Sequence, residues 1–393
     1  MRELIRRIDA ATPAGRDRAL DALRAFAILG VVLGHWLVTA LVADGGTLRG
    51  ASPLRHLPVL TPVSWVFQTL AVFFLVSGEV TARGYATARA RGTSYGRWLG
   101  GRLSRLFGPV AALLAVWAVV TGALVASGVG AVTVQTLVRL VLSPLWFLLV
   151  LAGLTAATPL VARLHPLWPL TVVLHIDVAR FGLGGPAWLG WVNVAAGWLV
   201  PYCLGAARSR GEARSRWSGW VLLLGGAAAT AALVRWAGYP AAMVGVPGAA
   251  ISNLNPPTLA AVTFGLAQCG AALLLLGPLR RALRRPAAWA AVALVNLSAM
   301  TIFLWHQTAM MAVTAAALAA DGPLPGLHTV PDGPDWVAAR LTWLPAFAVA
   351  LLACRAVFHR YERGRRARDA GRGRARGRRA EHPPLRRAAV GRW

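Results

Sequence analysis

Charged residues are scarce in this sequence, and their scarcity decides the class of protein. Only 14% of the 393 residues are charged, whereas 57% are hydrophobic and the mean hydropathy is +0.56. Too few polar side chains are present to cover a water-facing surface, which excludes a soluble globular domain.

Acidic residues are the scarcest of the charged ones. The chain has 14 Asp and Glu against 41 Lys and Arg, for a formal net charge of +27. In a soluble protein this balance would indicate nucleic-acid binding. Here the arginines stand at the ends of apolar runs and in one C-terminal tail, which is the pattern that membrane topology produces. We therefore expect no nucleic-acid partner.

Cysteine is also rare, and a cleavable leader is not expected. Cys203, Cys269 and Cys354 lie in different apolar segments with no CxxC or His/Cys spacing, so we expect neither a disulfide nor a zinc site. Residues 1–18 are polar for too long to form a signal peptide, and no small-residue cleavage pattern follows the first apolar run. They are expected to remain as a cytoplasmic lead-in.

Long apolar runs fill most of the chain. Runs of about 20 residues have the length that a helix needs to cross a hydrocarbon core of ~30 Å. They are continuously apolar, whereas strands of a membrane barrel would alternate over about ten residues. The predicted fold is all-α, a polytopic transmembrane helical bundle of about ten spans within residues 19–358. The expected spans lie near 24–42, 63–82, 107–126, 145–164, 167–179, 187–207, 217–236, 258–278, 289–319 and 336–358.

Arginine-rich connections alternate with arginine-poor ones along the chain. The basic segments are the N-terminus, 83–106, 208–216, 279–286 and the tail; the others are 127–144, 180–186, 237–257 and 320–335. Because basic loops stay in the cytoplasm, both termini are predicted to be cytoplasmic, in the plasma (cytoplasmic) membrane. The alternation requires the short fifth span, because without it the basic 208–216 segment and the tail would lie outside the cell.

The tail, residues 359–393, is rich in Arg and Gly and nearly devoid of apolar residues. This composition predicts a disordered cytoplasmic tail. We expect it to touch anionic lipids, with a specific partner as the alternative.

The first span contains two ionisable residues, Arg24 and His35. Each such residue costs roughly 2.5–3.5 kcal/mol on insertion scales. Their spacing puts both on one helix face, about 16 Å apart along the axis. Either Arg24 reaches the headgroups and His35 is a satisfied interhelical residue, or the face lines a polar channel in which neutral His35 takes a proton from a hydroxyl.

A second intramembrane histidine, His306, stands beside Gln307 in the ninth span. Two histidines on separate helices suggest one shared interior site, with a bond to a neighbouring helix as the structural alternative. A metal pair is disfavoured because no third ligand accompanies either histidine at helical spacing.

Further polar residues interrupt or flank the other spans. Glu79 near the end of the second span is expected to pair with Arg24 or Arg83. Asp177 ends the fifth span, where it is explained either by interfacial solvation or by acceptor binding.

The outer loop before the eighth span is uncharged and contains Asn255, paired prolines and Thr258, the expected helix cap. A rigid hydrogen-bonding loop of this kind suits a sugar or another polyol. Asn193 and Gln268 add amides inside neighbouring spans, so these residues and Asp177 are the candidate acceptor-binding residues.

Taken together, these residues resemble the acyltransferase-3 family of integral membrane O-acyltransferases. The motif is LDALRAFAILGVVLGHW, which contains Arg24 and His35, and supporting matches are FFLVSG (73–78), GRLSRLFGP (101–109), PLWFL (144–148), NPPT (255–258) and FLWHQ (303–307). In the family the pair corresponding to Arg24 and His35 is functional.

The resemblance implies a cytoplasmic acyl-CoA donor whose phosphates lie near the basic 83–106 segment, with Arg97, Arg102 and Arg105 as the candidate contacts. It also implies that His35 activates the acceptor hydroxyl, with Arg24 and His306 as the other candidate catalytic residues. The expected acceptor is a glycan or a glycosylated metabolite, and no metal is expected.

Two other functions are alternatives to an enzyme. A transporter or exporter of a glycan or lipid intermediate would be expected to show internally repeated halves, and residues 1–200 and 201–393 show no convincing similarity. A lipid-bound scaffold or sensor acting through the tail would leave His35, His306 and Asn255 unexplained.

Overall fold

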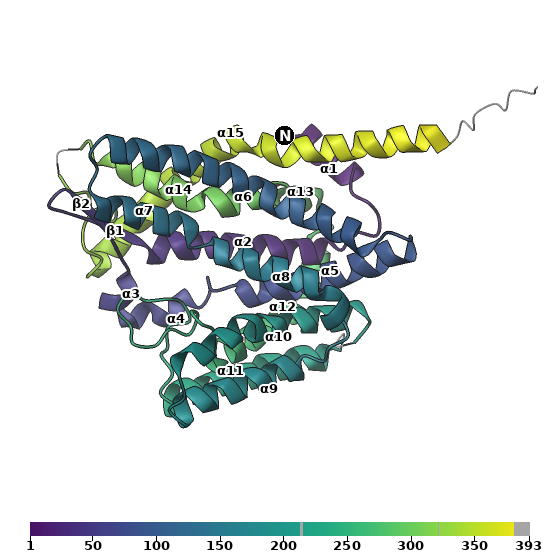
Figure 1. The fold of residues 1–393 in the computed structure, drawn as a ribbon, viewed down its shortest axis with the longest axis horizontal. Helices are drawn as coiled ribbons and strands as arrows, with labels where there is room; N and C mark the ends of the chain where they lie inside the picture. The colour runs from purple at the N-terminus through teal and green to yellow at the C-terminus, as the bar shows by residue number, and fades with distance from the viewer. Residues whose placement is uncertain (213–214, 321, 381–393) are drawn as a thin grey trace, which may run out of the picture.

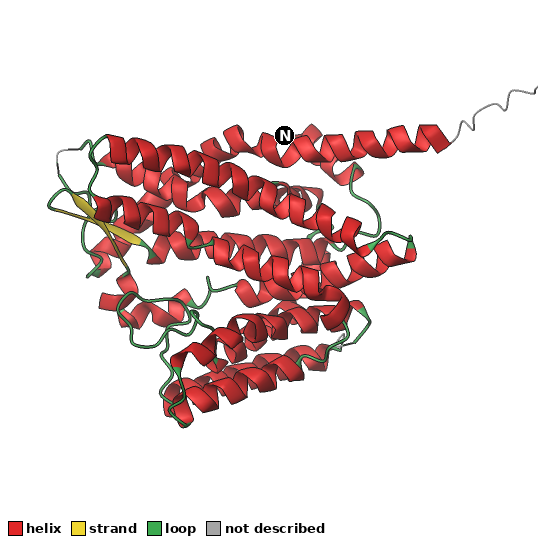
Figure 2. Cartoon of the chain, in the orientation of Figure 1, coloured by secondary structure: helices red, strands yellow, loops and turns green. Residues whose placement is uncertain are grey.

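The computed structural model describes residues 1–212, 215–320 and 322–380, with side chains to residue 358. Most of this part of the chain is helical, and the helices lie side by side with their long axes across the view of Figures 1 and 2. In chain order the elements are α1 (Arg2–Ala10), α2 (Arg18–Val38), β1 (Ala40–Asp44), β2 (Thr47–Ala51), α3 (Pro53–His56), η1 (Pro58–Leu60), α4 (Thr61–Ser64), α5 (Leu70–Ala90), α6 (Tyr95–Ala126), α7 (Ala131–Leu142), α8 (Leu145–Val161), α9 (Leu167–Asp177), η2 (Val178–Gly182), η3 (Ala187–Trp191), α10 (Val192–Ser209), α11 (Arg216–Trp236), α12 (Leu259–Ala282), α13 (Pro286–Leu297), α14 (Ala299–Ala317) and α15 (Pro334–Ala380).

Seven helical segments of the described chain are long and apolar enough to cross a membrane, or up to eight if a bent pair counts as one span. The seven are α2, α6, α7 with α8, η3 with α10, α11, α12 and residues 334–358 of α15. The bent pair is α13 with α14. The helical membrane bundle is thus supported, whereas the number ten stays a prediction.

Polar caps begin the helices that carry the site. The Asp17 side chain accepts from the backbone N–H groups of Ala19 and Leu20 at the start of α2. Thr258 accepts from the N–H of Ala261 at the start of α12, which confirms its prediction as a helix cap. Such caps satisfy donors that the first helical turn leaves unpaired.

The first span ends earlier than the predicted boundary at residue 42. After Val38 the chain forms the antiparallel β1–β2 hairpin, in which Ala40 pairs with Ala51 and Asp44 with Thr47. Gly45 and Gly46 form the two-residue turn with φ of 52° and 77°. Two glycines suit a tight hairpin turn because both central residues need positive φ.

Other predicted connections are helical. The 83–106 segment is not a loop, because α5 continues to Ala90 and α6 begins at Tyr95. Most of the predicted 127–144 loop is helix α7. The predicted tail begins as a continuation of α15 to Ala380, where Arg and Ala favour a helix and residues 359–380 contain no proline. Residues 381–393 lie outside the described chain.

The predicted ninth span, 289–319, is two helices. The chain bends by 69° between α13 and α14. Ser298 stands at the break, where its hydroxyl accepts a 2.5 Å hydrogen bond from Arg355 Nε of α15. The break separates Asn296 at the end of α13 from His306 on α14.

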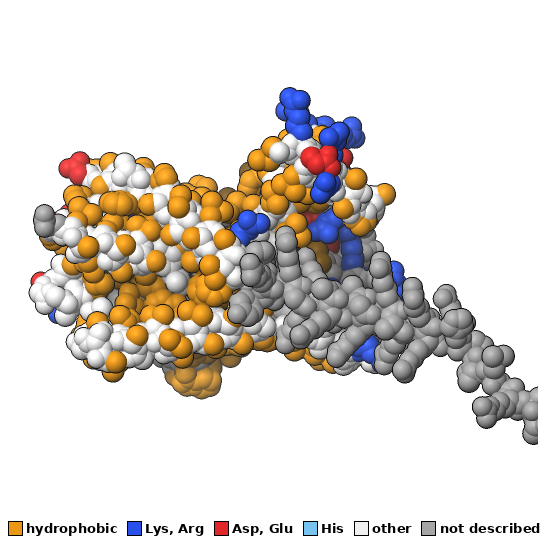
Figure 3. Space-filling model, turned by 90° about the horizontal axis from the view of Figure 1, so that it is seen from above, with side chains coloured by type: hydrophobic (Ala, Val, Ile, Leu, Met, Phe, Trp, Pro, Cys, Tyr) orange, Lys and Arg blue, Asp and Glu red, His pale blue; other side chains and the backbone are white. Residues whose placement is uncertain are grey.

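The two ends of the bundle differ in chemistry. The β1–β2 hairpin, α3 and α4 lie at one end, and α15 extends beyond the other (Figure 1). Figure 3 shows one face of the molecule, largely hydrophobic, with Lys and Arg side chains gathered toward the end opposite the hairpin. This segregation is expected of a protein whose basic side is cytoplasmic.

Candidate functional site

The structure brings the two intramembrane histidines together at the hairpin end of the bundle. The ring centroids of His35 on α2 and His306 on α14 are 5.1 Å apart. A 3.1 Å hydrogen bond joins Gln307 Nε2 to His35 Nδ1. Trp36 Nε1 donates to the backbone oxygen of His306 over 2.9 Å, which fixes α2 against α14 at this level.

The hydrogen bonds of His306 define its neutral tautomer. His306 Nδ1 lies 2.6 Å from the backbone oxygen of Phe303, which can only accept, so Nδ1 carries the proton. Nε2 then has a free lone pair, and it is buried with no hydrogen-bond partner among the described residues. The side chain is 0% exposed.

His35 can adopt either neutral tautomer, depending on the Gln307 amide. In one orientation the amide N–H donates to Nδ1 of His35, which leaves the proton of a neutral imidazole on Nε2. With the amide turned over, Oε1 accepts from Nδ1–H and Nε2 has a free lone pair, as a general base requires. Gln307 Oε1 is buried and without a hydrogen-bond partner within the described chain, so the turn breaks no bond to that oxygen.

A cavity of about 320 Å³ lies beside this pair. His35 and Gln307 are among its polar lining residues. Four aromatic side chains form much of its wall, and they are Phe67, Trp146, Phe147 and Phe303. Gly50 and Ala51 of the hairpin, Ser52 at the start of α3, and residues 244, 245 and 247 of the loop between α11 and α12 also line it. His306 is not among the lining residues, so His35 is the histidine that a molecule in this cavity could touch.

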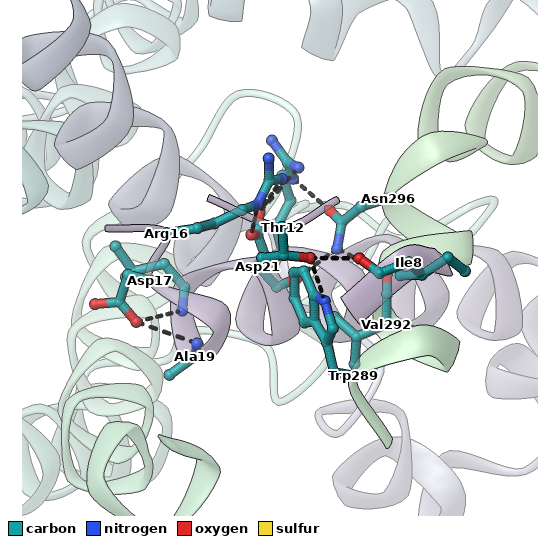
Figure 4. Close-up of polar contacts among 11 residues, drawn as sticks. Ile8, Thr12, Arg16, Asp17, Ala19, Asp21, Trp289, Val292 and Asn296 are labelled. Carbon is teal, nitrogen blue, oxygen red and sulfur yellow. Dashed lines mark hydrogen bonds and ion pairs between the residues drawn. The ribbon is translucent and has the colours of Figure 1, made fainter. Parts of the chain in front are cut away.

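Arg24 is held away from His35. Its Nε donates to Asn296 Oδ1 over 2.6 Å, and its guanidinium lies 3.2 Å from Asp21 Oδ1. Asn296 Nδ2 in turn donates to the backbone oxygen of Asp21, and Arg16 pairs with the same carboxylate. Figure 4 shows this network between the start of α2 and α13. Arg24 therefore connects α2 to the bent α13–α14 pair, about 16 Å along the axis from His35.

Thr12 and Trp289 extend the same network to α1. Trp289 Nε1 donates to the Thr12 hydroxyl over 2.7 Å (Figure 4). The lead-in segment is thereby attached to α13, which also packs against α2.

The three arginines predicted near the donor phosphates all stand on the first turns of α6. Arg97 and Arg105 are exposed on the first turns of α6. The Arg102 guanidinium lies 5.5 Å from the centroid of the Trp98 ring, and its Nε is buried without a hydrogen-bond partner in the described residues.

The candidate acceptor-binding residues do not line the cavity, and most of them are bonded to other parts of the chain. Asp177 is 1% exposed and accepts from Asn193 Nδ2 at 2.9 Å, from Tyr239 at 3.0 Å and from the Leu259 N–H at 2.7 Å. It thereby connects α9, α10 and the start of α12. Interfacial solvation does not describe this carboxylate, because it is buried.

The remaining candidates also have structural contacts. Thr258 is 1% exposed and donates to Asn253 Oδ1 over 2.6 Å. Gln268 Nε2 donates to the backbone oxygens of Trp65 and Gln68. Asn255 is exposed, and its N–H donates to the Ser252 hydroxyl over 3.1 Å.

Two features of the site were missed in the sequence. The aromatic cavity wall comes from α8, α14 and the segment before α5, which no local spacing brings together. Arg340 on α15 is 1% exposed and donates to the backbone oxygens of Trp36, Thr39 and Gly326 at 2.6, 2.6 and 2.9 Å. An arginine inside the last apolar run was the available signal for Arg340.

Comparison with known proteins gives one match. The model of a family described as "Acyltransferase domain" (Acyl_transf_3) matches residues 17–359. No curated protein and no solved structure matches the chain.

Proposed function

This chain belongs to the acyltransferase-3 family and is an acyltransferase, and from that premise we propose that it moves an acyl group from cytoplasmic acyl-CoA to a hydroxyl on the outer side. The proposed acceptor is a glycan or a glycosylated metabolite. The observation that carries the proposal is His35, whose ring lines a cavity of about 320 Å³ while Gln307 holds its Nδ1. An orienting partner on one ring nitrogen is what a histidine base needs to present the other.

The cavity suits an acceptor with a ring and several hydroxyls. Aromatic faces provide apolar contact for the C–H side of a sugar, and a few polar groups fix its orientation. Ser52, Ser64 and Gln68 line the cavity in addition to His35 and Gln307. The acceptor-binding role is therefore proposed for these residues.

The proposed reaction is a single acyl transfer. His35 Nε2 removes the proton of the acceptor hydroxyl as its oxygen bonds to the thioester carbon. The tetrahedral intermediate then breaks its C–S bond, and the proton on His35 passes to the departing CoA thiolate. An ester and free CoA result, and His35 returns to its neutral form.

The proposed topology has ten spans, with α5 and α9 counted in addition to those recognised by length and hydropathy. Both termini are cytoplasmic, in the plasma membrane, because the ends of α5, α10 and α12 and the start of α6 carry the arginines. Arg24 and the arginines of α6, including Arg97, Arg102 and Arg105, lie at this end, from which a cytoplasmic donor would enter.

The test is acyl transfer by purified His35→Ala. Loss of a general base typically removes about 10²–10⁴-fold of rate. We expect that loss with normal expression and membrane insertion, since the change removes a polar group from an apolar segment. His306→Ala is expected to lose less transfer activity than His35→Ala, because His306 does not line the cavity. Full transfer by well-expressed His35→Ala would refute the assignment.

The substrates can be identified in cells. Mass spectrometry of envelope glycans and secreted metabolites, with and without the gene, is expected to reveal a mass difference of one acyl group. That difference would identify both the acyl chain and the acceptor.

A further inference from the structure

A second and larger cavity lies at the arginine-rich end of the bundle, away from the histidines. It has a volume of about 650 Å³. Its lining includes five arginines from four helices, namely Arg83 of α5, Arg208 of α10, Arg216 of α11 and Arg280 and Arg281 of α12. We call it the arginine pocket. Asp17, which precedes α2, also lines it.

Positive charge in the arginine pocket exceeds the negative charge around it. Glu79, which is 0% exposed, binds Arg83 at 2.5 Å and Arg208 at 3.1 Å. Asp17 binds Arg280 at 2.8 Å. Burial alone would raise the pKa of Asp17. The ion pair with Arg280 and the hydrogen bonds from the first N–H groups of α2 outweigh that effect, so the pKa of Asp17 lies below its ordinary value.

Arg216 and Arg281 remain without a carboxylate within ion-pairing distance among the described residues. Arginines at the cytoplasmic ends of spans are usual. Their convergence from four helices on one cavity is a separate feature, because like charges brought together repel unless an anion joins them.

The backbone adds to this preference for an anion. Ser215, Arg216 and Gly219 line the pocket and belong to the cap and first turn of the 21-residue α11. The N-terminus of a helix carries a partial positive charge and unpaired N–H groups, which favour phosphate. Leu273, Leu274 and Leu276 supply an apolar side to the same cavity.

We propose that the arginine pocket binds a phosphate-bearing ligand. Planar guanidinium groups hold phosphate oxygens in pairs, and Arg216 and Arg281 are the two side chains available for this. The phosphate would come either from a nucleotide such as that of CoA or from an anionic lipid headgroup, which share this chemistry. Asp17 stands roughly 27 Å along α2 from His35, so the pocket is a site apart from the histidine cavity.

Binding, measured apart from acyl transfer, tests the proposal. The nucleotide probe is radiolabelled adenosine 3′,5′-bisphosphate, titrated onto the purified full-length chain in a zwitterionic detergent. The lipid probe is phosphatidylglycerol, compared with phosphatidylcholine, retained on the same protein in native mass spectrometry. The pocket variant is Arg216→Ala with Arg281→Ala, and the matched control is Arg284→Ala with Arg285→Ala, which removes the same charge from exposed arginines beside the pocket.

We expect one of the two probes to bind, and the pocket variant to weaken it roughly tenfold to a hundredfold per lost guanidinium. The control is expected to stay within about threefold, because Arg284 and Arg285 do not line the pocket and their solvent-exposed charges are screened by salt. Arg216→Lys with Arg281→Lys should bind with intermediate affinity, because the charge remains without the paired hydrogen bonds. His35→Ala should bind as wild type, which separates this proposal from the proposed reaction.

Two results would overturn the proposal. One is equal weakening in the pocket variant and its control, which would indicate only general attraction to a basic surface. The other is the absence of binding by both probes to a wild-type protein that melts at its normal temperature.

Discussion

At the scale of single residues, the two buried histidines differ in what their ring nitrogens can do. His306 bonds its Nδ1 to the carbonyl of Phe303 and has no place on the cavity wall. His35 lies on that wall, and Gln307 determines which of its nitrogens holds the proton. Gln307 is therefore expected to act through His35 as a positioning residue.

Replacing Gln307 tests this role. In Gln307→Met the His35 Nδ1–H loses its acceptor, and we expect kcat to fall about tenfold to a hundredfold, the value of a hydrogen bond to a charged group. KM for the acyl donor should change little. Gln307→Glu keeps an acceptor for Nδ1–H and should retain more activity than Gln307→Met, as measured by steady-state kinetics. A lower rate for the Glu variant than for the Met variant would contradict the proposed tautomer of His35, which carries its proton on Nδ1.

At the scale of elements, α5 and α10 approach so closely that only glycine fits between them. A Cβ on Gly205 would lie 2.8 Å from the backbone nitrogen of Glu79, and a Cβ on Gly78 would lie 2.8 Å from the backbone carbon of Tyr202. Small residues at such contacts allow helices to pack backbone to backbone in membranes. The contact also holds Glu79 where Arg208 can reach it.

A methyl group at this contact is expected to be costly. Gly205→Ala should lower the stability of the folded protein by about 1–3 kcal/mol through overpacking. The matched control is Gly225→Ala on α11, where an added Cβ meets no atom within 4 Å. Thermal unfolding in detergent measures both variants, and equal melting temperatures would contradict the close packing.

The end of α2 that carries His35 depends on Arg340. The last backbone carbonyls of a helix lack hydrogen-bond partners within that helix. Arg340 donates to the backbone oxygen of Trp36 in the last turn of α2 and to that of Thr39, which follows the helix. Arg340→Met should leave buried oxygens unpaired, at about 1–3 kcal/mol each. We expect a lower melting temperature than in the control Arg49→Met, which alters an exposed arginine of the hairpin. An unchanged melting temperature would show that water satisfies these oxygens.

At the scale of the whole molecule, the separation of the two ends determines how substrates reach the site. The hairpin lies at one end of the long helices (Figure 1), and Lys and Arg side chains gather toward the other end (Figure 3). The proposed donor and acceptor would enter from these opposite ends and meet within the bundle.

Reporter fusions test this orientation. A reporter fused after the C-terminal residue should be cytoplasmic, because α15 extends beyond the arginine-rich end of the bundle (Figure 1), which is the proposed cytoplasmic end. A reporter inserted near Asp332 should be external, since residues 320–335 contain acidic residues and no Lys or Arg. Tags at the N-terminus and C-terminus that label on opposite sides of the membrane would refute an even number of spans.

The sequence by itself determined the membrane class, the helical fold and the family. Apolar length and charge are properties of local composition, so the approximate positions of the spans, the Thr258 cap and the basic ends of helices could be predicted. The pairing of Glu79 with Arg83 was also predictable, because residues four apart share one helix face. His35 and His306 are both isolated polar residues in apolar runs, which suggested one shared site. Their rings do lie next to each other in the structure.

Only the tertiary structure decided which polar residues share a cavity. Asp177 and Asn193 look like binding residues in the sequence, but they pair with each other inside the bundle. Arg24 faces α13 while His35 faces α14, although both stand on one face of α2, because the break at Ser298 gives α13 and α14 different directions. The physical reason is that a buried polar group must find a partner, and the partners are contributed by helices that are distant in sequence.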